Sequence, residues 1–403
     1  MDRIYLSPPN ISNEEFNSVK KALDSNYVAP VGPQVNQFER EFSEYTGVKN
    51  CLAVSSGTAA MHLALRAIGC KPNDEVIAST LTFIGSVSPV TFLGSKPIFI
   101  DSDYTTWNMD PALLEETLYN SFKRGKLPKA VVPTDLYGQC CDYKRIFEIC
   151  ENYKVPVIVD SAEADGAKYR WNNNHNNKTR SIHSGKNARI AIYSFNGNKI
   201  LTTSGGGMLA SDDKKILDYA RYLSQQAREG LPHYEHMEIG YNYRMSNILA
   251  AIGSAQLKNL DCRLSKKREI YNYYKKALGD IQGIEIMPKA AYSIPNHWLT
   301  VILLSPDKFG ADREVVRIAL KKENIESRPI WKPMHLQPAF FIQSKMTNGA
   351  PKTPNSFPAE IVGCRVSEDI FLSGLCLPSG TSMNKTELDR VIDIILNCQN
   401  LHK

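Results

Sequence analysis

The sequence predicts an α/β protein: a large domain, in which a mostly parallel mixed sheet lies between helices, and a smaller C-terminal α+β domain. Between residues 51 and 160, short apolar runs of strand length alternate with helical patterns, which is typical of parallel strands joined by crossovers. The chain has 403 residues, which is too long for one ordinary hydrophobic core. We therefore expect a large domain over residues 1–260, including the N-terminal segment, and a small domain over residues 261–403.

Each element of the large domain has its own signal. Phe38 and Phe42 are four residues apart, which predicts a helix over residues 35–45 with both rings on one face. Apolar runs predict buried strands at residues 51–54, 75–79, 96–101, 130–138 and 155–160, and helices at residues 61–68 and 86–93. Residues 171–186 are rich in Asn and break this rhythm, so they form either a solvent loop or a two-stranded excursion.

The second half of the chain is richer in helical patterns. Residues 214–229 predict an amphipathic helix, and an Ala-rich helix over residues 248–274 is expected to link the two domains. The smaller domain combines a strand at residues 298–304 with helices at 312–322 and 385–396. Near the N-terminus, residues 25–33 are rich in turn formers but too apolar for a plain linker, so we expect them to lie against the body near the pocket.

Composition excludes several classes of protein. A hydrophobic share of 42% without a run of about 18 apolar residues predicts no membrane span, and no secretory signal is visible at the N-terminus. Nine scattered cysteines, an odd number, indicate reduced thiols in the cytoplasm. The net charge of +6 is dispersed, which favours small anionic substrates over nucleic acid. His175 and His183 lack a third ligand at suitable spacing, so we expect no metal.

Polar residues follow two of the predicted strands. Residues 55–60 (SSGTAA) open a helix directly after a strand, so the free amides of the helix N-terminus are suited to a phosphate, although an ordinary N-cap also explains them. Asp160 ends another strand, where its carboxylate can meet a ring nitrogen or a metal, or can cap a helix. Ligands of parallel sheets gather at this carboxyl edge.

Two further stretches carry chemically useful side chains. Lys199 stands alone in the segment 193–207 (YSFNGNKILTTSGGG), where close backbone packing favours a partly buried amine that can form a Schiff base. The alternative is a solvated surface lysine. Residues 327–335 (SRPIWKPMH) place cations beside an aromatic ring in a Pro-rich turn, which suits a nucleotide diphosphate.

Six motifs occur together in one order: SSGTAAMHLAL, TLTFIGSVSP, DSAEADGAKY, YSFNGNKILTTSGGG, GYNYRMSN and RPIWKPMH. In this order and spacing the chain resembles the DegT/StrS-type nucleotide-sugar aminotransferases, which are pyridoxal phosphate (PLP) enzymes of fold type I. The resemblance covers almost the whole chain and is closest to the aminotransferases of bacillosamine biosynthesis. It implies transfer of the amino group of L-glutamate to C4 of a UDP-linked 4-keto-6-deoxy-2-acetamido hexose, giving a UDP-4-amino sugar and 2-oxoglutarate.

The resemblance also implies roles for individual residues. Lys199 would carry PLP and act as base and acid by turns, and Asp160 would hold the proton on the pyridine nitrogen. Phe83 would stack on the ring unless it is an ordinary core aromatic, and Glu163 would face the ring hydroxyl. The implied phosphate ligands are Thr58, Ala59, Ser194 and, from the partner chain of a homodimer with shared sites, Asn242. The implied substrate contacts are Tyr27, Arg328, Trp331, Lys332 and His335.

Several rival functions remain beside this one. The acceptor can be another UDP- or dTDP-linked 4-keto or 3-keto sugar. A PLP-dependent sugar dehydratase of the same fold has histidine in place of the lysine, so Lys199 argues against it. A catalytically silent regulator of this fold would have no need to keep Asp160, Ser194 and Lys199 together. A nicotinamide enzyme is excluded because no Gly-x-Gly-x-x-Gly follows a strand.

Overall fold

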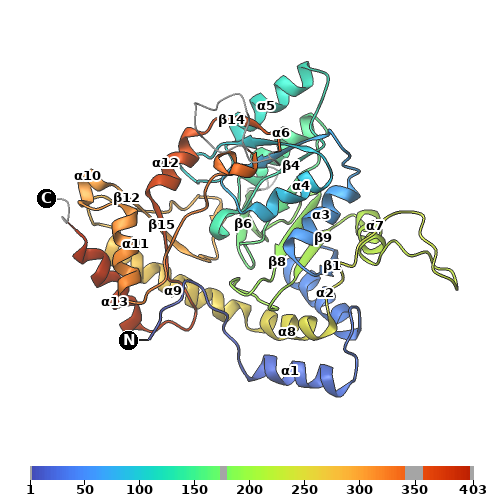
Figure 1. Cartoon of the computed structure of the whole chain (residues 1–403), viewed down its shortest axis with the longest axis horizontal. Helices are drawn as coiled ribbons and strands as arrows, with labels where there is room; N and C mark the ends of the chain where they lie inside the picture. The colour runs from blue at the N-terminus through green and yellow to red at the C-terminus, as the bar shows by residue number, and fades with distance from the viewer. Residues whose placement is uncertain (1, 173–178, 341–356, 400–403) are drawn as a thin grey trace.

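The computed structural model describes residues 2–172, 179–340 and 357–399 (Figure 1). Its main feature is a mixed sheet whose strands run β14 (Glu360–Val362), β3 (Lys96–Ile100), β2 (Glu75–Ser79), β4 (Ala130–Val132), β5 (Ile158–Asp160), β8 (Ile190–Ser194), β9 (Gly207–Ser211) and β1 (Asn50–Val54). Two parallel bridges, 131 to 157 and 134 to 160, join its halves between β4 and β5. Among these strands of the described residues, β9 alone runs opposite to all the others, so the predicted mostly parallel mixed sheet is confirmed.

Helices cover both faces of this sheet because successive strand residues point to opposite sides. On β1, Leu52 and Val54 pack in the cluster that contains α3 (Gly57–Ala67) and α7 (Lys214–Ser224). Cys51 and Ala53 pack in the opposite cluster, which takes in Phe38 and residues of α8 (Asn247–Lys258). The other helices of this part are α1 (Asn13–Asp24), α2 (Pro33–Thr46), α4 (Ser88–Phe92), α5 (Pro111–Lys123) and α6 (Tyr143–Asn152).

A second, antiparallel sheet forms the C-terminal part of the molecule. Its strand order is β10 (Ile284–Ile286), β12 (Thr300–Leu304), β15 (Gly374–Leu377) and β13 (Arg328–Pro329). The helices of this part are α9 (Leu260–Leu278), α10 (Pro306–Phe309), α11 (Arg313–Lys322), α12 (Arg365–Ser373) and α13 (Lys385–Asn397). The division at residue 260 stays a prediction, and β14 lies beyond it although it pairs with β3 of the large sheet.

Several predicted boundaries differ from those observed. Helix α7 ends at Ser224 rather than near residue 229, because Gln226 and Ala227 have positive φ angles that no α-helix accommodates. The single helix expected over 248–274 is two helices, α8 and α9, that meet at Asn259. Strand β4 ends after Val132, since the next residue is a proline without an N–H to donate.

The Asn-rich segment that interrupts the pattern is a two-stranded excursion where the structure describes it. β6 (Lys168–Asn172) and β7 (Thr179–His183) pair antiparallel, and β11 (Ser293–Ile294) pairs with β6. His183 lies against the Tyr45 ring, and His175 falls outside the described residues. Within the described ranges, no helix is long and apolar enough to cross a membrane, and no cluster of His, Cys, Asp or Glu is arranged to hold a metal.

Candidate active site

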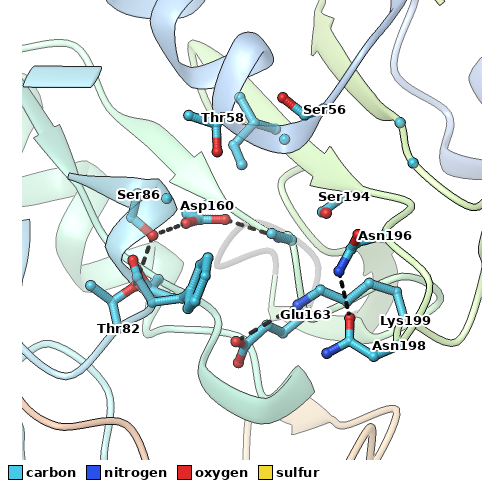
Figure 2. A pocket seen from close by; sticks show the side chains of 18 of the residues that line it. Ser56, Thr58, Thr82, Ser86, Asp160, Glu163, Ser194, Asn196, Asn198 and Lys199 are labelled. Carbon is cyan, nitrogen blue, oxygen red and sulfur yellow. Dashed lines mark hydrogen bonds and ion pairs between the residues drawn. The ribbon is translucent and has the colours of Figure 1, made fainter. Parts of the chain in front are cut away.

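A cavity of about 390 Å³ opens where β5 and β8 end and α3 begins (Figure 2). Its lining includes seven residues singled out from the sequence: Thr58, Phe83, Asp160, Glu163, Ser194, Lys199 and Trp331. These residues come from the carboxyl edge of the large sheet, from the segment after β2 and from the C-terminal part of the chain. The cavity therefore collects side chains that are far apart in sequence, at the sheet edge where ligands of parallel sheets bind.

The N-terminus of α3 forms one end of the cavity. Ser56 caps the helix by accepting a hydrogen bond from the Ala59 N–H at 3.0 Å, and Gly57 and Thr58 line the cavity. An added Cβ at Gly207 would lie 2.5 Å from the carbonyl carbon of Ser56, so only glycine lets β9 approach the start of this helix. An added Cβ at Gly57 would lie 3.0 Å from Ser194 Cβ. First-turn amides and a hydroxyl thus stand together, which suits a phosphate.

Asp160 is buried at the end of β5. Its carboxylate accepts hydrogen bonds from the Ser86 hydroxyl and from the Ala162 N–H, the latter at 3.0 Å. Burial raises the pKa of Asp160, while Ser86, Ala162 and the nearby charge of Lys199 oppose that rise. The carboxylate is therefore held by two hydrogen-bond donors, and a cationic partner would favour its ionised form in this buried position.

Lys199 follows a tight turn in which its N–H donates to the Asn196 carbonyl at 2.9 Å. Its side chain is 11% exposed, and Nζ lies 3.8 Å from Glu163 Oε1. Burial lowers the pKa of Lys199, and the negative charges of Glu163, Asp160 and Asp165 act in the opposite direction. The surface-lysine interpretation is therefore wrong, and the amine lies in the kind of pocket that makes lysine a usable base and nucleophile.

Glu163 links the lysine to an aromatic wall. Its carboxylate accepts hydrogen bonds from the Tyr137 N–H at 2.7 Å and from the Trp331 indole N–H at 3.0 Å. The rings of Tyr137 and Trp331 stack with centroids 6.0 Å apart. The Phe83 ring, with 51% of the residue exposed, tilts against Trp331 at 5.2 Å. Because Phe83 lines the open cavity, it is not the core aromatic that the sequence left as an alternative.

A second cavity of about 500 Å³ adjoins the first, and the two share Asn198, Trp298 and Trp331. Residues of the N-terminal segment, 5–8, line it together with Arg328. The guanidinium of Arg328 is largely exposed and donates to Glu326 Oε1 at 2.9 and 3.1 Å. A cation and aromatic faces thus lie next to the lysine cavity.

Other residues singled out from the sequence lie outside both cavities. His335 is buried, with Nδ1 2.6 Å from Thr80 Oγ1 and Nε2 3.0 Å from Glu368 Oε1, so the structure gives it a packing role instead of a substrate contact. Ala59 also lies outside them, and its N–H donates to the Ser56 side chain. Tyr27 and Lys332 are exposed, and Asn242 forms an antiparallel β-bridge with Gln225.

Sequence reasoning missed several residues of the site. Ser86 lies within the motif TLTFIGSVSP but had no assigned role, and here it donates to Asp160. The sequence pattern predicts for Trp298 only the start of a strand, yet its ring lies beside Lys199. Asp165 is buried near Lys199, and its Oδ1 has no hydrogen-bond partner among the described residues. The DSAEADG stretch holds this third carboxyl, but its sequence does not indicate a burial of this kind.

The residues present fit PLP. A helix N-terminus with a hydroxyl beside it suits the phosphate, and the anchored Asp160 carboxylate suits a protonated ring nitrogen. Lys199 supplies the amine, and Phe83 supplies an exposed ring to stack on. The cavity thus offers a partner for each end and for one face of the cofactor.

Comparison with known proteins finds similarity over nearly the whole chain. The family model described as the DegT/DnrJ/EryC1/StrS aminotransferase family matches residues 9–396. A Bacillus subtilis (strain 168) protein named as the pyridoxal phosphate-dependent aminotransferase EpsN is 45% identical, covering 98% of this chain and 95% of its own. The GDP-perosamine synthase of Caulobacter vibrioides is 33% identical over 97% of each chain. A solved DegT DnrJ EryC1 StrS aminotransferase from Brucella abortus superposes with a TM-score of 0.83 at 26% identity, covering 96% and 95%.

Proposed function

The chain belongs to the DegT/DnrJ/EryC1/StrS aminotransferase family, and from this premise we propose its donor, its acceptor and its catalytic residues. The enzyme is a PLP-dependent sugar aminotransferase. It takes the amino group of L-glutamate, in the cytoplasm, and places it on C4 of a UDP-linked 4-keto-6-deoxy-2-acetamido hexose, as in bacillosamine-type pathways. The observation that carries the aminotransferase assignment is the buried Lys199 amine, which shares one cavity with Glu163 and Asp160.

The residues of the cavity have distinct tasks. When bound, PLP supplies an electron sink for the bond that breaks at the substrate carbon. Lys199 would hold the cofactor, and its free amine would act first as the base that takes the proton from the α-carbon of glutamate and then as the acid that gives it back. Asp160 would keep the proton on the ring nitrogen, and the start of α3 with Ser194 would hold the phosphate. In the second half-reaction the same amine would act in the reverse order and deliver a proton to C4 of the sugar.

The nucleotide sugar needs room and cations beyond this cavity. The adjoining cavity offers Arg328 and the ring of Trp331, which suit a nucleotide diphosphate and its base. The UDP and acetamido groups are inferred from the similarity of the sequence motifs to the bacillosamine subgroup. The relative named GDP-perosamine synthase makes a GDP-linked sugar the second candidate.

A panel of acceptors tests the substrate. Purified enzyme should convert L-glutamate and a UDP-4-keto-6-deoxy-2-acetamido hexose to 2-oxoglutarate and an amino sugar, detected by mass spectrometry. Matched acceptors are the same sugar without the acetamido group and GDP- and dTDP-linked 4-keto-6-deoxy hexoses. A higher kcat/KM on any of these would overturn the UDP-acetamido assignment.

Borohydride reduction tests the cofactor residue independently of the acceptor. Reduction of the PLP-loaded enzyme should leave a pyridoxyl group on the peptide that contains Lys199. The Lys199→Ala variant should lose that adduct and about 10³-fold or more of its transamination rate. An adduct on another lysine would contradict the assignment even if the panel succeeded.

We further propose a homodimer whose two sites are each built from both chains, with Asn242 reaching the phosphate of the partner's cofactor. In one chain Asn242 lies outside the lysine cavity, so a shared site explains its place in the motif GYNYRMSN. Lys199→Ala and Asn242→Ala homodimers should both be weak. Verified mixed dimers should regain activity at the one site that keeps both side chains, whereas a site made within one chain predicts no recovery.

A further inference from the structure

Trp298 has no part in the tasks described so far, yet it lies directly against the cofactor lysine. Lys199 Nζ is 3.9 Å from the centroid of the Trp298 ring, and Trp298 is 1% exposed. At that separation an ammonium is attracted by the negative face of an indole, and the attraction is strongest where water is excluded. The face of the ring can therefore bind the Lys199 amine at the wall of the cavity.

Several hydrogen bonds fix the ring in place. The indole N–H donates to the carbonyl of Asn198, the residue before Lys199, at 2.7 Å. The Trp298 N–H donates to Asn296 Oδ1 at 2.8 Å, and Lys267 Nζ donates to the Trp298 carbonyl at 2.8 Å. Asn296 also donates to the carbonyls of Glu163 and Asp165. These hydrogen bonds thus connect the Trp298 ring to the turn before Lys199 and, through Asn296, to the segment that carries Glu163 and Asp165.

The surroundings of the amine explain why a ring is useful there. The charged groups that act on Lys199 are Glu163, Asp160 and Asp165. Glu163, the one in ion-pair range, already accepts bonds from Tyr137 and Trp331. A carboxylate both attracts an ammonium and can take its proton, whereas an indole face attracts it and cannot. The ring can therefore hold the amine without competing for the proton that the amine must carry.

We propose that Trp298 is the positioning residue that holds the free amino group of Lys199 whenever Lys199 is not attached to the cofactor. The inference rests on the proposed role of Lys199 and adds a resting place for its released amine. Lys267 and Asn296 contribute by fixing the ring. The Trp298 ring stabilises the protonated form of Lys199. Loss of the ring should therefore increase the fraction of neutral amine at a given pH.

Trace labelling of the full-length, cofactor-free chain with acetic anhydride measures this directly. The labelling rate of Lys199, read by peptide mass spectrometry, is followed from pH 7 to its alkaline plateau. The ratio of the two rates reports the neutral fraction and cancels changes in access. Trp298→Leu should raise the ratio about 3- to 30-fold, and Trp298→Phe, which keeps a weaker ring face, should fall between Leu and wild type.

Two controls keep the outcome unambiguous. Trp107→Phe alters another buried indole that does not line the cavity and should leave the ratio unchanged. A trifluorotryptophan introduced only at position 298 keeps the shape and weakens the negative face, so it should raise the ratio even if the Leu variant does not fold. Equal ratios for wild type and the fluorinated chain, or for Leu and Phe, would overturn the proposal. Because no cofactor is used, a wrong cofactor lysine would be seen in the borohydride experiment and not here.

Discussion

The two sides of the lysine cavity are built on different physical principles. The sheet side presents the start of α3, the Ser194 hydroxyl and the Asp160 carboxylate at the ends of strands in one sheet. The opposite side presents flat rings, Trp298 and Trp331, from the C-terminal part of the chain. Charged and hydrogen-bonding groups dominate one side, and flat rings with weak cation binding dominate the other, where Lys199 Nζ lies 3.9 Å from the centroid of the Trp298 ring.

This difference separates two requirements of a group-transfer enzyme. In the proposed mechanism the sheet side holds an ionised cofactor in one orientation, which strand ends in fixed register can do. The ring side has to accept two different substrates in turn, and flat apolar faces discriminate less sharply between them than buried charges do. If this division is right, substitutions on the sheet side should be more damaging than those on the ring side.

Of the substitutions that separate the two sides, Asp160→Asn should have the largest effect. Asp160→Asn keeps the size of the side chain but loses the charge that we propose holds the proton of the cofactor's ring nitrogen, so kcat should fall roughly 10²- to 10³-fold. Since burial raises the pKa of Asp160, wild-type activity should decline as pH falls and this carboxylate becomes protonated, whereas the variant should lack that limb. Steady-state rates across pH check both points. Ser86→Ala, which removes one donor to Asp160, should be milder, and near-normal turnover by the Asn variant would contradict the role.

A smaller effect is expected at Gly207, which supports the sheet side without lining the lysine cavity. Gly207→Ala places a Cβ 2.6 Å from the Gly57 N atom, so the start of α3 must move, at a cost of about 1–3 kcal/mol in stability. Cofactor affinity should fall with it. PLP titration and denaturant unfolding measure the two losses. Gly197→Ala, whose added Cβ would have only the Ser204 carbonyl oxygen at 3.8 Å, is the matched control and should change neither quantity.

The smallest effect is expected on the ring side at Trp331. Trp331→Phe keeps a ring but removes the indole donor to Glu163, a bond that lowers the pKa of that carboxyl, so the pKa of Glu163 should rise. The KM for the nucleotide sugar should increase about 3- to 10-fold with little change for glutamate. Trp331→Leu, which loses the ring as well, should be worse. A fall in kcat in Trp331→Phe as large as that in Asp160→Asn would contradict the proposed division between the two sides.

The sheet side is also the part that could be predicted from the sequence. Asp160 and Ser194 end strands, and Thr58 begins a helix after one, so local pattern alone brings them to one edge. The place of Trp298 beside Lys199 depends on how the two sheets pack, so the pattern of its own strand does not show it. Ser86 was missed for another reason, because its bond to Asp160 joins segments that are far apart in sequence. The same limit explains His335, whose pairing with Thr80 and Glu368 is a tertiary contact. The end of α7 was misplaced because positive φ at Gln226 and Ala227 has no signal in an amphipathic pattern.

Strand β14 has a consequence for how the chain is made. β3 pairs with β2 on one side and with β14 on the other, and β14 begins only at Glu360. During synthesis the outer edge of β3, an apolar and buried strand, therefore remains open until nearly the whole protein has left the ribosome. An uncovered edge of this kind is a template for pairing with another nascent chain. Truncation before residue 360 should accordingly yield aggregation instead of a smaller folded domain, and co-expressed chaperones should matter more for this protein than its size alone suggests.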